Sequence, residues 1–219
     1  VAVVVPYERQ SRQHLSDPFF LSLIGSLADA LTDRGLEMLL TRVDVQQLDA
    51  AAQSFETGRA IGIVLVGQWH HHEHLNALAD RGVPMVVWGA QIPGQHYATV
   101  GSHNVEGGAA VTGHLLDRSA RRILFLGDTR LEEVAGRYEG YRQAHAKHRL
   151  KVDRKLCQSV PFEQEAAAKL LPPLLQSLSF DAVFCASDLM AMTTIALLQR
   201  TGKRVPQDVM VAGYDDISL

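Results

Sequence analysis

The sequence predicts an α/β fold of two Rossmann-like lobes, each a parallel sheet flanked by helices, and three observations lead to it. Short β-branched runs alternate with longer helical patterns along almost all of the 219 residues. The strand-like runs are continuously apolar, which indicates burial on both faces, as in a parallel sheet. Gly35, Gly82 and Gly202 come just after helical patterns, where a left-handed residue often ends a helix. Together these features favour a doubly wound architecture.

The expected elements follow one another as strand–helix pairs from the first residue onward. Each strand is expected where a short run rich in valine, isoleucine, leucine or phenylalanine stands between polar or glycine-containing segments. These runs are Val1–Pro6, Glu37–Val43, Ile61–Val66, Met85–Trp88, Tyr97–Val100, Ile123–Gly127, Leu156–Val160, Ala182–Cys185 and Val209–Ala212. The longer patterns between them predict helices at Phe19–Arg34, Gln47–Thr57, His72–Arg81, Glu106–Arg118, Glu133–His148, Glu163–Ser177 and Leu189–Thr201.

The strand–helix rhythm breaks once, between Trp88 and Asn104. The polar segment Gly89–His96 contains glycine and proline and leads into a short strand, so we expect a lobe boundary near Gly101–His103. This divides the chain into an N-terminal lobe, residues 1–102, and a C-terminal lobe, residues 103–219. Each lobe then holds four or five strand–helix units, which predicts two similar lobes with a cleft between them.

Composition excludes several classes of protein. A net charge of −3 gives no electrostatic footprint for nucleic acid, because a DNA-reading domain is usually basic. No apolar run approaches the roughly 18 residues of a membrane span. Val1–Val5 is apolar but lacks the basic start and length of a signal peptide. Cys157 and Cys185 have no metal-type spacing, so we expect inert thiols and a reducing cytoplasm.

Acidic residues follow two of the expected buried strands. One apolar run ends in Ser187-Asp188 and another in Gly213-Tyr214-Asp215-Asp216. In an open parallel sheet, ligands bind at the carboxyl ends of the strands. Two carboxylates at the same edge therefore predict a site for hydroxyls or cations rather than for phosphate. Asp188 stands where a helix begins, so it is expected as a helix cap, a ligand acceptor or both.

Six sequence motifs, taken in order, resemble a known family. They are V-V-V-P with Asp17–Phe20, Val100–Gly108, Arg121–Asp128, Arg137–Tyr141, Ser187-Asp188 and Gly213–Asp216. Over its whole length the chain is similar to the effector-binding domain of LacI/GalR-family bacterial transcription regulators, which have the periplasmic-binding-protein-like fold of type I. The resemblance implies a homodimeric, cytoplasmic regulator in which a small effector, often a sugar or a nucleoside-type metabolite, controls operator binding allosterically. The family's helix-turn-helix DNA-binding headpiece and the C-terminal portion that returns to the first lobe are expected to lie outside this chain.

The resemblance also implies which residues contact the effector. It places Phe19, Phe20 or both against the ligand, although core packing is an equal alternative from the residues alone. Trp88 ends a strand, where its indole would suit the apolar face of a pyranose or would pack in the core. Phe162 matches a family aromatic residue that stacks on the ligand. Asp215 is favoured over Asp216 as the carboxylate that points into the cleft.

Arg137 lies in the family's R-x-x-G-Y motif, which aims an arginine into the cleft. Its planar fork would hold two hydroxyls or a carboxylate. The alternative is a surface salt bridge to Glu133, four residues earlier on the same helix. By resemblance, Glu133 occupies a variable position that lines the effector pocket and sets specificity. Rings, an arginine fork and carboxylates suit a neutral sugar or glycoside, and no glycine-rich phosphate loop is present. No cofactor is expected.

Two histidine features need separate interpretation. His103 stands where the family usually has aspartate, so it is either a pH-responsive group near the lobe crossing or a neighbour without a role. The run His70–His74 suggests a zinc site, but it lacks the H-E-x-x-H order. We therefore favour the interpretation that these histidines are solvated. No metal site is predicted.

An enzyme is not expected either, because no nucleophile elbow, P-loop or dinucleotide fingerprint occurs. The alternative function is a periplasmic sugar-binding protein of a transporter.

Overall fold

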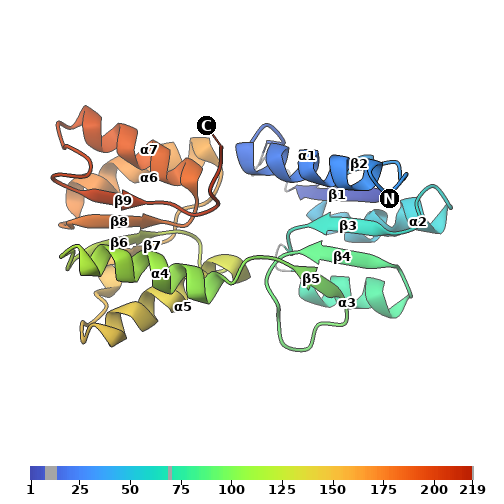
Figure 1. The fold of residues 1–219 in the computed structure, drawn as a ribbon, viewed down its shortest axis with the longest axis horizontal. Coiled ribbons are helices and arrows are strands. Elements are labelled where there is room, and N and C mark those ends of the chain that lie inside the picture. The colour runs from blue at the N-terminus through green and yellow to red at the C-terminus, as the bar shows by residue number, and fades with distance from the viewer. Residues whose placement is uncertain (8–13, 69–70, 219) are drawn as a thin grey trace. The chain divides into compact units, whose positions relative to one another are not determined.

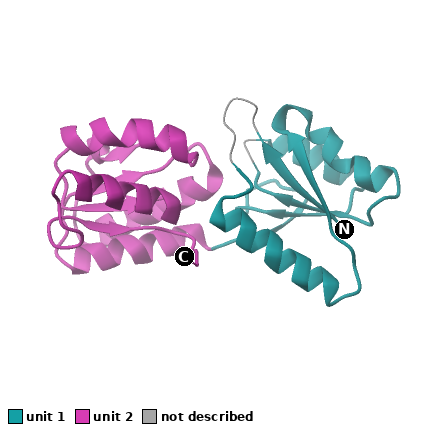
Figure 2. Cartoon of the chain, turned by 90° about the horizontal axis from the view of Figure 1, so that it is seen from above, with its two compact units in different colours: residues 1–102 teal, residues 103–219 magenta. Residues whose placement is uncertain are grey.

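The computed structural model describes residues 1–7, 14–68 and 71–218, which fall into two compact units, Val1–Ser102 and His103–Leu219 (Figure 2). Each unit contains one sheet flanked by helices, and every strand pair in both sheets is parallel. The predicted α/β class with parallel sheets is therefore confirmed. Figure 1 shows the elements of each unit.

The first unit has a five-stranded sheet in the order β2-β1-β3-β4-β5. Its elements are β1 (Ala2–Tyr7), α1 (Pro18–Thr32), β2 (Leu39–Asp44), η1 (Val45–Ala52), α2 (Gln53–Glu56), β3 (Ile63–Val66), α3 (His72–Asp80), β4 (Met85–Trp88) and β5 (Ala98–Val100). Alternate residues of the strands enter opposite cores. Ala2 and Val4 pack in the core with η1 and α3, whereas Val3 and Val5 pack in the core under α1.

The second unit has a four-stranded sheet in the order β7-β6-β8-β9. Its elements are α4 (Asn104–Asp117), β6 (Ile123–Leu126), α5 (Glu132–Lys147), η2 (Arg154–Leu156), β7 (Cys157–Gln158), α6 (Gln164–Ser177), β8 (Ala182–Cys185), α7 (Asp188–Arg200) and β9 (Met210–Ala212). Helices α4 and α5 cover one face and α6 and α7 cover the other (Figure 1). β6 and β8 are fully buried, as their continuous apolar runs predict.

Two elements differ from the expectation. The helix expected at Gln47–Thr57 is instead the 3₁₀ helix η1, with a non-helical residue at Gln47, followed by the single turn α2. The Asp44 carboxylate accepts a hydrogen bond from the Gln46 backbone, so the chain turns as soon as β2 ends. The strand expected at Leu156–Val160 shrinks to the two residues of β7, which pairs with β6 alone.

Candidate functional site

The carboxyl ends of β8 and β9 bring both predicted acidic segments to one edge of the second sheet. The two strands are paired in parallel, from Ala182 with Met210 to Phe184 with Ala212. The chain after β8 continues through Ala186 and Ser187 into α7, and the chain after β9 continues through Gly213 and Tyr214. Their main chains meet where the Asp188 N–H donates to the Tyr214 carbonyl oxygen at 2.8 Å.

Arg137 lies at the centre of a polar cluster at this edge. It is only 7% exposed, and its Nε donates to Asn104 Oδ1 at 2.9 Å. Its Nη1 donates to the Ala186 carbonyl oxygen and lies 3.7 Å from Asp215 Oδ1. The guanidinium carbon is 3.8 Å from the centroid of the Tyr214 ring, in cation–π contact. We call Arg137, Asn104, Tyr214 and Asp215 the arginine cluster.

The electrostatics of the arginine cluster keep a buried cation in place. Burial lowers the pKa of Arg137, because desolvation disfavours its charged form, while Asp215, Tyr214 and Glu133 act in the opposite direction. Arginine remains protonated nevertheless, since its ordinary pKa lies far above neutral pH. The alternative of a surface salt bridge between Arg137 and Glu133 is wrong, because Arg137 is buried. Glu133 itself is half-buried on the first turn of α5.

Glycines let α4 and α5 approach closely enough to join Asn104 to Arg137. A Cβ on Gly108 would overlap the carbonyl oxygen of Arg137 and lie 2.8 Å from its carbonyl carbon. A Cβ on Gly140 would overlap the Val105 carbonyl oxygen in the same way. Because Asn104 begins α4 and Arg137 lies one turn into α5, this backbone contact sets the position of the Nε–Oδ1 hydrogen bond.

One interpretation from the sequence, that Asp188 caps α7, is wrong. Ser187 is the N-cap, and its Oγ accepts from the Met190 N–H at 3.3 Å. Asp188 is the first helical residue, and its Oδ2 accepts from the Ile217 N–H at 3.0 Å. Its carboxylate thus bonds to the segment that follows β9.

Phe162 is half-buried beside the sheet of the second unit. It follows β7 and contacts both core clusters of that unit. The ring therefore has one part in the core and one part exposed, which is compatible with packing and with ligand contact.

The aromatic residues predicted in the first unit form a group at the start of α1. The Phe19 ring lies 5.7 Å from the Phe20 ring and 6.0 Å from the Trp88 ring, centroid to centroid. Asp17 caps the helix by accepting from the Phe19 N–H at 2.9 Å. Phe20 is buried in the core under α1, as its core-packing alternative held, whereas Phe19 and Trp88 are half-buried.

Sequence reasoning missed Asn104 and Tyr214. Both stand inside motifs that carried the resemblance, directly beside residues that were selected, His103 and Asp215. Their membership in these motifs was the available signal, whereas their contacts with Arg137 come from other elements of the fold. Asn104 is the first residue of α4, and Tyr214 follows the glycine after β9.

Among the described residues, the histidines outside the arginine cluster show no arrangement for a metal. His103 is exposed at the N-cap position of α4, and its side chain makes no capping hydrogen bond. His70 lies outside the described residues. The rings of His71 and His74 are 5.6 Å apart in an edge contact. Within the described part of the chain, no three histidine, cysteine or acidic side chains are grouped so that they could hold a metal ion.

Neither cysteine shows the signs of a reactive thiol. Both are free; burial raises the pKa of Cys185 to about 12 and also raises that of Cys157. Among the described residues, none of the helices has the length and apolar character needed to cross a bilayer.

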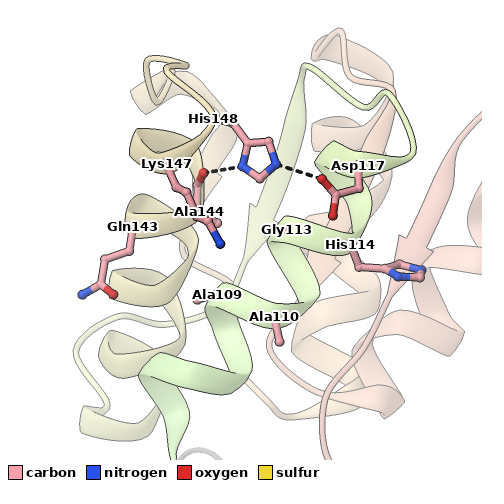
Figure 3. A pocket seen from close by; sticks show the side chains of 9 residues that line it. All are labelled: Ala109, Ala110, Gly113, His114, Asp117, Gln143, Ala144, Lys147 and His148. Carbon is pink, nitrogen blue, oxygen red and sulfur yellow. Dashed lines mark hydrogen bonds and ion pairs between the residues drawn. The ribbon is translucent and has the colours of Figure 1, made fainter.

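A groove of about 550 Å³ lies between the C-terminal halves of α4 and α5 (Figure 3). None of the eight residues predicted for the site lines it. His148 bridges the two helices there, with Nε2 3.0 Å from Asp117 Oδ1 and Nδ1 2.8 Å from the Ala144 carbonyl oxygen. Both partners accept hydrogen bonds, so the geometry is satisfied by the imidazolium. Its pKa is raised, chiefly by the hydrogen bond to Asp117.

We expect the His148–Asp117 pair to make stability depend on pH. Because the pKa of His148 is raised by folding, its contribution is complete below the unfolded pKa of about 6.5 and is lost as pH rises through the folded value. The His148→Gln variant should melt below the wild type at about pH 5.5 and level with it at about pH 8. Thermal unfolding at both pH values measures this, and Asp117→Asn should reproduce it. A Tm difference independent of pH would contradict the prediction.

Comparison with known proteins identifies what this chain is similar to. Residues 112–219 match the model of the periplasmic binding protein-like domain. The chain is 30% identical over 225 residues to the HTH-type transcriptional regulator CelR of Thermobifida fusca; the alignment covers 100% of the chain and 65% of that regulator. The chain thus spans less than two thirds of the length of the curated relatives it matches, 65% of this one.

Solved structures of two transcriptional regulators have the same fold as this chain. A transcriptional regulator CelR–cellobiose complex superposes with a TM-score of 0.83 at 27% identity, covering 99% of the chain and 67% of that structure. A regulator of the LacI family from Sanguibacter keddieii superposes with a TM-score of 0.78 at 25% identity, covering 99% and 78% respectively. Residues 112–219 thus match a periplasmic binding protein-like domain, and the chain shares its fold with transcriptional regulators of the LacI family.

Proposed function

We propose that this chain is the sugar-binding effector domain of a LacI-type DNA-binding transcription regulator. The observation that carries the proposal is the arginine cluster: a buried guanidinium held by Asn104, Tyr214 and Asp215 at the carboxyl edge of a parallel sheet. Such an edge is the usual ligand position in α/β folds. A buried cation that is oriented by fixed partners costs little further reorganisation when a polar ligand binds.

The chemistry of the predicted residues suits a sugar or glycoside. Arg137 and Asp215 offer charge-assisted hydrogen bonds, which are the stronger kind, to hydroxyl groups. The half-buried rings of Phe162 in the second unit and of Phe19 and Trp88 in the first suit apolar sugar faces. Phe20 supports Phe19 from the core, and Asp188 acts through the segment that carries Asp215. The half-buried Glu133, on the turn of α5 before Arg137, is the specificity residue of this proposal.

The cellobiose complex of CelR supports the choice of ligand class, since that structure shares this fold at 27% identity. In the proposed regulator, effector binding shifts the population of domain arrangements in a homodimer and so changes operator affinity. Operator DNA would be bound by a helix-turn-helix headpiece outside these residues, and a regulator of chromosomal genes works in the cytoplasm. The relatives are regulators rather than enzymes.

Thermal shift against a small panel tests the proposal directly. The protein is melted with cellobiose, glucose and ribose, and with a purine base as the non-sugar comparison. A ligand present at about 100 times its Kd should add roughly 2.7 kcal/mol to the free energy of unfolding. A saturable shift with one of the sugars supports the proposal. A shift with the purine base alone would contradict the sugar assignment.

A further inference from the structure

We infer that Asp188 is a positioning residue: its carboxylate holds the segment Gly213–Ile217, so that Tyr214 and Asp215 are fixed against Arg137. The inference rests on the proposed function, which gives Arg137 and Asp215 the effector. It assigns Asp188 to the second layer of the site, one step removed from the ligand. The segment Gly213–Ile217 is called the acidic turn below.

Two hydrogen bonds join Asp188 to the acidic turn from both of its ends. The backbone N–H of Asp188 donates to the Tyr214 carbonyl oxygen at 2.8 Å. The side-chain Oδ2 accepts from the Ile217 N–H at 3.0 Å. One residue thus brackets Asp215 on its two sides. A carboxylate also suits the first turn of α7, where the partial positive charge of the helix end favours an anion.

The packing leaves no room for the acidic turn to move toward Asp188. A Cβ on Gly213 would overlap Asp188 Oδ1 and lie 3.0 Å from the Asp188 Cα. On the other side, a Cβ on Gly107 of α4 would lie 2.6 Å from the Tyr214 hydroxyl oxygen. The turn is therefore in contact with α7 on one side and α4 on the other, and a side chain at Gly213 or Gly107 would have to displace Asp188 or Tyr214.

The backbone of the acidic turn adopts a conformation that needs such support. Asp215 has φ of 112° and Asp216 has φ of 55°, in the region that residues other than glycine seldom adopt. Residues held this way persist only where their surroundings determine the conformation. The two hydrogen bonds from Asp188 to the acidic turn constrain its backbone in this conformation. The strained residue is the same one whose carboxylate lies 3.7 Å from Arg137 Nη1.

Hydrogen exchange of the Ile217 amide, followed by NMR without any ligand, tests the inference. In Asp188→Ala the exchange should accelerate by at least about tenfold, because the amide loses its charged acceptor. In Asp188→Asn the side-chain oxygen still accepts, so exchange should stay within about threefold of the wild type. Glu165→Ala, which removes an exposed carboxylate on the first turn of α6 in the same unit, is the matched control and should leave Ile217 unchanged. Equal protection of Ile217 in all variants would overturn the inference.

Cellobiose affinity by calorimetry separates positioning from ligand contact. A positioning role predicts that Asp188→Asn binds within about threefold of the wild type, whereas Asp188→Ala loses about tenfold or more. Equal losses in both variants, with Ile217 still protected in Asp188→Asn, would show direct contact with the sugar and overturn the inference. If cellobiose does not bind the wild type, the proposed function fails on that sugar, and the exchange measurement alone decides the role of Asp188.

Discussion

Replacing Arg137 with alanine is expected to abolish the sugar-induced rise in Tm and to destabilise the second unit even without ligand. The substitution removes a hydrogen-bond donor from the buried Asn104 and from the Ala186 carbonyl oxygen, and it takes the ion-pair partner from Asp215. Breaking one side of a buried charged network costs about 3 kcal/mol or more, since the remaining groups stay desolvated. Urea unfolding measures this loss, and thermal shift with cellobiose measures binding.

Two further arginine variants make the result specific. Arg137→Lys keeps the charge but loses the planar fork, so we expect partial recovery of stability with sugar affinity still lowered by about tenfold. Arg142→Ala, on the same helix, removes an exposed side chain that pairs with Glu139 and should change stability by less than about 0.5 kcal/mol. If both Arg137 variants keep the full sugar-induced rise in Tm, Arg137 does not contribute to sugar binding.

The sequence predicts the location of the arginine cluster better than its internal connections. Strand ends follow from apolar runs, so the arrival of Ser187-Asp188 and Gly213–Asp216 at one sheet edge is predictable. The direction of a carboxylate is not, because it depends on tertiary contacts. Whether Asp188 caps α7 or bonds to Ile217 is decided by the chain 29 residues later. For the same reason Asn104 was missed: its partner Arg137 lies on a different helix.

In the first unit too, local sequence patterns predict where elements begin, whereas tertiary contacts decide which side chains enter the core. The helix expected at Phe19–Arg34 begins one residue earlier, at Pro18, with Asp17 as its cap. Whether Phe19 or Phe20 enters the core depends on the rotation of α1 over the sheet, which follows from packing on β1 and β3. The segment after β2 does begin as a helix, because Asp44 caps η1 by accepting from the Gln46 N–H, but the non-helical residue Gln47 interrupts regular α-helical geometry.

Gly108→Ala is expected to lower the free energy of unfolding of the second unit by about 2 to 4 kcal/mol, because it forces two helix backbones apart. The new Cβ would overlap the Arg137 carbonyl oxygen and lie 2.8 Å from the Arg137 Cα. These are backbone atoms, which cannot rotate away as a side chain would. The loss exceeds the gain in helix propensity of about 1 kcal/mol that alanine brings over glycine. Urea unfolding, with hydrogen exchange on α4 and α5, measures the effect.

Gly113→Ala on the same helix is the matched control. A Cβ at Gly113 meets no atom within 4 Å, so the substitution gains the propensity without the overlap and should stabilise by about 0.5 to 1 kcal/mol. Because the two variants of one helix should change the free energy of unfolding in opposite directions, they distinguish the effect of backbone contact from that of helix propensity. The contact also sets the Asn104–Arg137 hydrogen bond, so Gly108→Ala should weaken cellobiose binding while Gly113→Ala leaves it unchanged. Equal stabilities for the two variants would mean that α4 and α5 are not in backbone contact.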